Sequence, residues 1–251
     1  MAAAEGAVPL EAAEGAGCIA NLIQEYGVIH LTNALDTAQQ QELWQLTKPY
    51  IKDPQRSATG FSGFSVVGRK SAKNRPQKRV PAFDDFGCMV FHLCADHLNR
   101  VYSNAEDCEG EPAFKHLLDL ASGAKEVNMG EVQGNYYRED AVLLNHVDSD
   151  GILFTMSVAL GDDCEFVIGK PTGRMKRMSE RSGRERKIVM KSGDAMFFDG
   201  GSVPHQVTRM IPGTAPEWFQ EQKVPNGSRC VVLFREKEEC FYKTMISSER
   251  K

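Results

Sequence analysis

The chain has 251 residues, of which 41% are hydrophobic and 25% are charged, and its formal net charge is −4. This length and composition exclude a disordered or collagen-like chain and favour one large domain. No stretch approaches the roughly 18 consecutive apolar residues that a membrane-spanning helix needs. We therefore expect a folded protein with no membrane partner.

The first residues and the cysteines bear on the compartment. Residues 1–17 are rich in Ala, Gly and Glu, and we expect them to form a disordered tail without an export or transit signal, ahead of a single domain over 18–251. The seven cysteines are scattered and never spaced C-x-x-C. This argues against a disulfide framework and favours a reducing compartment. We expect a cytoplasmic or nuclear monomer.

The first half of the chain predicts one strand and three helices, separated by a long loop. A short strand is expected at Gly27–Leu31, and Asp36 is a suitable cap for a helix that Pro49 ends. Residues 51–81 have no period and are dense in Gly, Ser, Lys and Arg, which predicts a long exposed loop or hairpin. Further helices are expected at Phe86–Tyr102 and Glu111–Leu120.

From about residue 125 the pattern changes to short strands separated by turns. The clearest strand is Ile152–Leu160, where apolar side chains alternate with Thr155 and Ser157. Further strands are expected at Cys164–Ile168, Ile188–Met190, Ala195–Phe198, Gln206–Met210 and Cys230–Arg235. The expected fold class is α+β, with an antiparallel sandwich or jelly roll braced by the N-terminal helices.

The chain has a negative net charge but contains two strongly basic segments, which we call the basic islands. Residues 69–79 contain six Lys or Arg and no acids, and residues 170–187 contain eight against two Glu. Each island is therefore +6, which leaves −16 for the rest of the chain. Local clusters of this kind indicate a polyanionic partner, although a solvated loop explains them as well.

One spacing of histidine and aspartate is typical of a metal site. His146 and Asp148 lie two residues apart, so on an extended strand both side chains point to the same face. His205 follows a turn at 200–204 and precedes an expected strand, where its imidazole can point inward. Two His and one carboxylate form the facial triad of non-haem Fe(II) oxygenases. The His-x-Asp pattern alone also fits an ordinary surface pair.

The last expected strand carries two arginines on an apolar background. Arg229 and Arg235 are six residues apart, so both face the same way as Val231 and Leu233. A buried guanidinium is costly unless an anion meets it. Six residues span roughly 20 Å at about 3.3 Å each, so the two arginines could bracket a small dicarboxylate.

Together these motifs make residues 125–236 similar to the AlkB-like family of Fe(II)- and 2-oxoglutarate-dependent dioxygenases, with a weaker similarity at Gly27–Leu46. The matching elements, in order, are Asn135-x-Tyr137, His146-x-Asp148-x-Asp150, Gly193-Asp194, His205, and Arg229 with Arg235. Five elements in register are far more specific than any one of them.

The resemblance implies a double-stranded β-helix core over 125–236 and a site that uses Fe(II), 2-oxoglutarate and O2. It implies that iron is held by His146, Asp148 and His205. It also implies that Arg229 and the Tyr137 hydroxyl bind the distal carboxylate of 2-oxoglutarate, that Asn135 and Arg235 complete the cosubstrate site, and that Asp150 handles a substrate base. Val231 stands where relatives often have a polar residue, and residues 209–228 suggest a loop inserted near the site.

The implied reaction is oxidative demethylation of N-methylated bases in DNA or RNA, as in DNA repair, with release of succinate, CO2 and formaldehyde. Residues 61–81 lie where AlkB-like demethylases carry a nucleotide-recognition lid, in which Lys70, Lys73 and Arg75 would contact phosphates. Phe61 and Phe64 would stack on a flipped base or, alternatively, anchor the loop. A hydroxylase acting on a protein side chain or small molecule remains an alternative, as does, less favoured, a non-catalytic binding module.

Overall fold

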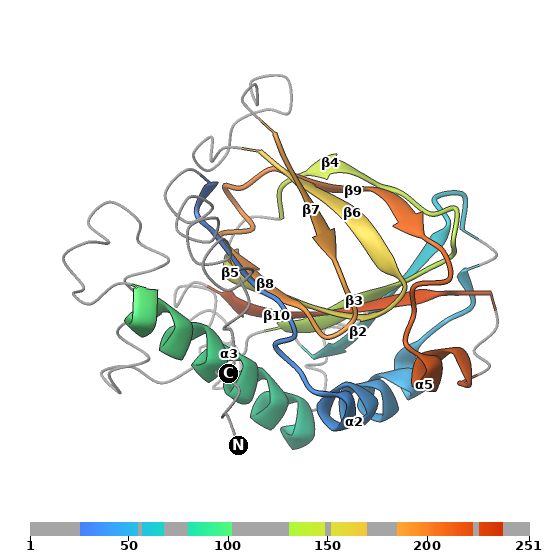
Figure 1. Cartoon of the computed structure of the whole chain (residues 1–251), viewed down its shortest axis with the longest axis horizontal. Coiled ribbons are helices and arrows are strands. Elements are labelled where there is room, and N and C mark those ends of the chain that lie inside the picture. Colours follow the sequence, from blue (N-terminus) through green and yellow to red (C-terminus); the bar gives the residue numbers. More distant parts are fainter. Residues whose placement is uncertain are drawn as a thin grey trace, which may run out of the picture.

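The computed structural model describes residues 26–54, 57–67, 80–101, 131–148, 152–169, 185–222 and 226–237. Two antiparallel sheets face each other, and helices cover the outer side of the larger sheet (Figure 1). The larger sheet has the order β1 (Val28–Leu31), β8 (Ala195–Phe198), β5 (Ile152–Gly161), β10 (Arg229–Lys237), β3 (Glu131–Tyr137) and β2 (Phe61–Val67). The smaller sheet has the order β4 (Leu143–His146), β9 (His205–Ile211), β6 (Asp163–Ile168) and β7 (Arg186–Met190). This arrangement is the predicted jelly roll.

The alternation along the central strands places the core on one side and a pocket on the other. In β5 and β10 the side chains toward the helices form the apolar core, namely Phe154, Met156, Val158, Leu160, Cys230, Val232 and Phe234. The intervening side chains point between the two sheets and line the pocket, namely Thr155, Ser157, Arg229, Val231, Leu233 and Arg235. The predicted strands of the second half are confirmed, with ends that differ by at most two residues.

Two long helices brace the larger sheet. Helix α2 (Thr37–Thr47) starts at the predicted cap, where Asp36 accepts a hydrogen bond from the Gln39 main-chain N–H at 2.8 Å and the Gln39 side chain accepts one from the Asp36 N–H. Helix α3 (Pro81–Val101) begins five residues earlier than predicted. Proline is well tolerated in the first helical position, so Pro81 begins this helix. None of the described helices is long and apolar enough to cross a membrane.

The expected loop over 51–81 is partly wrong. After a short 3-10 helix, η1 (Lys48–Tyr50), residues 61–67 form strand β2, which pairs with β3 at the edge of the larger sheet. Phe64 and Val66 alternate with serines and are buried, but the Gly- and Ser-rich surroundings obscure this period in the sequence. The first part of the predicted lid is therefore sheet, whereas 68–79, the tail at 1–17 and the helix expected at Glu111–Leu120 lie outside the described residues.

The segment between β9 and β10 supports the helix layer. Helix α5 (Glu217–Gln220) lies beside α2 (Figure 1), where the Phe219 ring packs against Trp44 at a centroid distance of 4.8 Å. The Trp44 indole N–H also donates to the Gln222 side chain at 3.1 Å. This part of the suggested insertion therefore packs on α2.

Candidate active site

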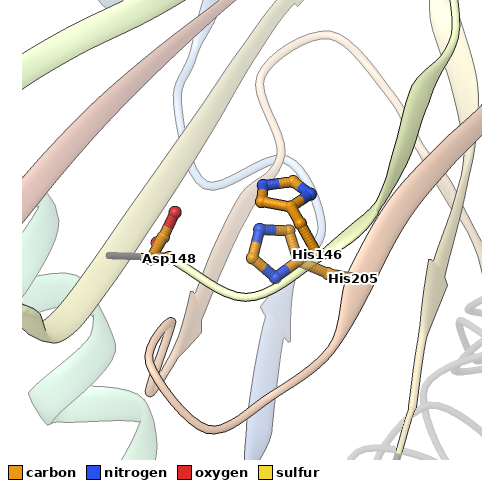
Figure 2. A group of neighbouring side chains, drawn as sticks. All are labelled: His146, Asp148 and His205. Carbon is orange, nitrogen blue, oxygen red and sulfur yellow. The ribbon is translucent and has the colours of Figure 1, made fainter. Parts of the chain in front are cut away.

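The structure brings the three predicted iron ligands together. His146 ends β4, His205 begins β9, and their Cα positions are paired across the two strands. Figure 2 shows the two imidazoles beside each other with the Asp148 carboxylate next to them, and the ligand atoms of all three residues lie within 4.8 Å of one another. Strand β4 ends before Asp148, so the i, i+2 spacing of a strand does not set the direction of this side chain. Its main-chain N–H instead donates to the Gly200 carbonyl at 2.7 Å.

Both histidines present the same nitrogen to the site. The Nδ1 atom of His146 lies 2.8 Å from the Leu144 carbonyl, and Nδ1 of His205 lies 2.9 Å from the Val203 carbonyl. A carbonyl oxygen only accepts, so each Nδ1 carries the proton and donates it. In the neutral form of each ring the lone pair is then on Nε2, which is the tautomer that a metal requires.

The Asp148 carboxylate is held by donors on both oxygens. Arg235 Nη2 donates to Oδ1 at 2.5 Å, and the Thr155 hydroxyl donates to Oδ2 at 2.8 Å. Burial alone would raise the pKa of Asp148. The positive charge of the Arg235 guanidinium and the neighbouring His205 outweigh this effect, so the pKa of Asp148 lies below its usual value. The carboxylate is consequently anionic and ready to bind a cation.

His205 is buried among aromatic rings. The Phe198 ring meets its imidazole edge-on at a centroid distance of 4.8 Å, and the Phe166 ring stacks at 5.9 Å. Burial lowers the pKa of His205 to about 4, although Asp148 acts in the opposite direction. A neutral imidazole at neutral pH is the form that binds a metal.

A pocket between the two sheets extends from His146 and His205 to Arg229. Both arginines of β10 line it, as their even spacing predicted. The Arg229 side chain is fully buried, and its Nη1 donates to the carbonyls of Asp162 and Met190, whereas Nε and Nη2 have no hydrogen-bond partner among the described residues. Leaving buried N–H groups without an acceptor is costly, so this end of the pocket fits a carboxylate.

Asn135 and Tyr137 line the same pocket on β3. The Asn135 side-chain amide donates to the Tyr137 hydroxyl oxygen at 3.0 Å, which leaves the hydroxyl proton to donate elsewhere. Burial raises the pKa of Tyr137 above its usual value, so the phenol stays protonated. This geometry suits a tyrosine that donates a hydrogen bond to an anion beside Arg229.

The predicted substrate residues separate into three groups. Phe64 is only 6% exposed and belongs to the main core, so its ring cannot stack on a base, and the anchoring alternative describes it. Phe61 is half-buried, with its ring 5.3 Å from that of Tyr137. The remaining predicted substrate residues lie outside the described residues, namely Asp150, Lys70, Lys73 and Arg75.

Sequence reasoning missed two residues that shape the site. The sequence marks Thr155 only as a polar position on its strand, although it contacts the Asp148 carboxylate. Gly200 gives no signal beyond its place in a turn, yet a Cβ atom there would lie 2.1 Å from Asp148 Oδ2. The polar alternation along β5 is a usable signal for Thr155, whereas nothing local indicates the close approach at Gly200.

Comparisons with known proteins agree with this geometry. The family model of the 2OG-Fe(II) oxygenase superfamily matches residues 18–235. Among solved structures, that of OsALKBH1 has a TM-score of 0.60 at 19% identity, covering 84% of this chain and 98% of that chain. A 2OG-Fe(II) oxygenase family oxidoreductase from Burkholderia pseudomallei has a TM-score of 0.52 at 17% identity, covering 89% and 92%. No curated protein sequence matches significantly.

These findings agree on the double-stranded β-helix fold and on the chemistry that the pocket can hold. Two imidazoles and a carboxylate form a donor set suited to Fe(II), and the buried Arg229, with two N–H groups that have no partner among the described residues, suits one end of a dicarboxylate. The family match spans most of the sequence. The chain therefore belongs to the 2OG-Fe(II) oxygenase superfamily and is a dioxygenase that depends on Fe(II), 2-oxoglutarate and O2.

Proposed function

We propose that this dioxygenase is AlkB-like and removes methyl groups from the nitrogen atoms of nucleic acid bases. The spacing of its motifs from Asn135 to Arg235 supports the assignment. The fold similarity to OsALKBH1, which extends over 98% of that chain, is consistent with it.

In this proposal His146, Asp148 and His205 hold the iron. Bound Fe(II) supplies the coordination sites for 2-oxoglutarate and O2, and with them the oxidation of a C–H bond. Arg229 and the Tyr137 hydroxyl hold the distal carboxylate, and the pocket walls exclude water. With 2-oxoglutarate and O2 both bound, the overall reaction would place one atom of O2 in succinate, with loss of CO2, and the other on the methyl group, which would leave as formaldehyde.

The observation that carries the nucleic acid assignment is the place where the two basic islands join the fold. The island at 170–187 begins just after Ile168 and ends in β7, and Ile168 is paired with both Arg186 and the candidate ligand His205. The second island, at 69–79, follows the end of β2, where Val67 is paired with Val132. Both islands are therefore attached near the metal end of the pocket.

The attachment point of the island at 69–79, at the end of β2, is connected to the metal site through the neighbouring strands β3 and β10. Val132 is paired with Phe234 on β10, next to Arg235, and the Arg235 guanidinium donates to Asp148. Polycationic segments whose flanking residues lie at this end favour a polyanionic substrate, because phosphate contacts provide most of the sequence-independent affinity for nucleic acids. A protein side chain or small-molecule substrate would require neither island.

The activity can be tested directly with purified protein, Fe(II), ascorbate and 2-oxoglutarate. Succinate and formaldehyde are followed with N-methylated oligonucleotides, with methylated peptides, and with no substrate. We expect equimolar succinate and formaldehyde with an oligonucleotide, and loss of both products in His146→Ala and Asp148→Ala. Succinate coupled only to hydroxylation of a peptide or small molecule would contradict the proposal, and no succinate under any condition would indicate a binding module.

The contribution of the islands can be separated from the chemistry. Replacing Lys70 and Lys73 by Gln, with or without Arg75→Gln, should weaken oligonucleotide binding and lower the slope of log K against log salt by about 0.7–0.9 for each phosphate that the variant no longer neutralises. The matched control is Lys48→Gln with Lys52→Gln, which removes two exposed charges near the end of α2. Equal salt slopes in the parent, island and control proteins would contradict a role for this island.

A further inference from the structure

We propose that Thr155 is a positioning residue for the iron site, which keeps the Asp148 carboxylate available to the metal instead of to Arg235. The inference rests on the proposed assignment of Asp148 as an iron ligand. It assigns to Thr155 a role in metal affinity that goes beyond its packing in β5.

The Asp148 carboxylate has two competing partners in the protein. Arg235 Nη2 donates to Oδ1 at 2.5 Å, whereas the Thr155 hydroxyl donates to Oδ2 at 2.8 Å. Thr155 and Asp148 are 1% and 8% exposed, so water does not compete strongly for these atoms. Each carboxylate oxygen is thus held by a different residue.

Arg235 has a second donor that could take the other oxygen. Its Nε has no hydrogen-bond partner within the part of the chain that the structure describes, and its Nη1 lies 3.7 Å from Glu131 Oε1. Nε and Nη2 lie on the same edge of the guanidinium and can bind a carboxylate in a two-pronged fashion, which is the strongest arrangement for this pair. A terminal carboxylate torsion is soft, so Asp148 could turn toward this fork.

The Thr155 hydroxyl opposes that rotation by binding Oδ2. Without it, Oδ2 loses its donor and gains most by turning onto the Arg235 Nε–H. If both carboxylate oxygens bound Arg235, their lone pairs would no longer point toward the metal position beside the Nε2 atoms of His146 and His205. Residues that orient a metal ligand in this way typically change metal affinity by about 10- to 100-fold when they are replaced.

The test is Mn(II) binding to the metal-free protein, measured by calorimetry. Thr155→Val keeps the shape and the β-branch but removes the hydroxyl, and we expect it to weaken Mn(II) binding by about 10- to 100-fold. Thr155→Ser restores the donor and should bind within about twofold of the parent. The control is Thr208→Val, which removes a hydroxyl bonded to Glu165 at 2.6 Å, outside the triad, and should leave Mn(II) affinity unchanged.

One further variant separates the possible failures. Asp148→Ala should abolish Mn(II) binding, and parent-like binding by this variant would overturn the ligand assignment itself. If Asp148→Ala loses the metal while Thr155→Val binds like the parent, the role of Thr155 is overturned and the ligand assignment stands.

The competition with Arg235 has its own readout, which compares two Thr155 variants after the guanidinium has been removed. In an Arg235→Lys background the guanidinium fork is absent, so Thr155→Ser and Thr155→Val should bind Mn(II) with nearly the same affinity. Circular dichroism of the metal-free variants checks that each is folded. A full Thr155 effect in the lysine background would overturn the proposed competition.

Discussion

At the scale of single residues, the iron site depends on an absent side chain. A Cβ atom at Gly200 would lie 2.1 Å from Asp148 Oδ2 and 2.6 Å from Thr155 Oγ1, so a methyl group must displace the carboxylate. Gly200→Ala should therefore weaken Mn(II) binding by at least about tenfold, on the order expected for a misoriented ligand, and reduce 2-oxoglutarate turnover. At Gly201 the same atom would meet nothing closer than 3.4 Å, so Gly201→Ala is the matched control. Equal affinities in the two variants would contradict this explanation.

At the scale of elements, α5 supports the helix layer independently of the metal. Phe219 is buried against Trp44 of α2, and the metal ligands belong to the β4–β9 region. Phe219→Ala should lower the free energy of unfolding of the metal-free protein by about 3–5 kcal/mol, measured by urea denaturation, because it leaves a cavity in the core. The Mn(II) affinity of the folded fraction should not change. Glu217→Ala, at an exposed position of the same helix, is the control. If it lowered the free energy of unfolding as much as Phe219→Ala does, the bracing role of Phe219 would be contradicted.

At the scale of the whole molecule, the buried His205 links stability to pH. Burial lowers its pKa in the folded state to about 4, whereas an imidazole in the unfolded chain titrates near its ordinary value of 6.5. As pH falls from 6.5 toward 4, the unfolded chain binds a proton that the folded protein does not, so stability falls. Chemical denaturation of the metal-free protein across this range measures the slope, which His205→Gln should reduce. An unchanged slope in that variant would show that other groups cause the loss of stability.

The fold was predictable wherever a local pattern coincides with tertiary burial. Along β5 and β10 the alternation of side chains separated the core face from the pocket face, and the Asp36 cap located the start of α2. The alternation of buried and exposed side chains was harder to recognise in β2, because only Phe64 and Val66 mark it among glycine and serine residues. Its register comes from pairing with β3, a strand more than 60 residues away in the sequence.

What the sequence by itself determined was the chemistry of the site: two histidines, an aspartate and two arginines in a characteristic order, with both arginines on one strand face. The tertiary structure decided how those groups are oriented. It placed Asp148 beyond the end of β4 and surrounded its carboxylate with Thr155, Arg235 and Gly200. The physical reason is range, because spacing along a strand sets which face a side chain occupies, whereas hydrogen bonds and steric limits around a buried carboxylate come from segments that only folding brings together.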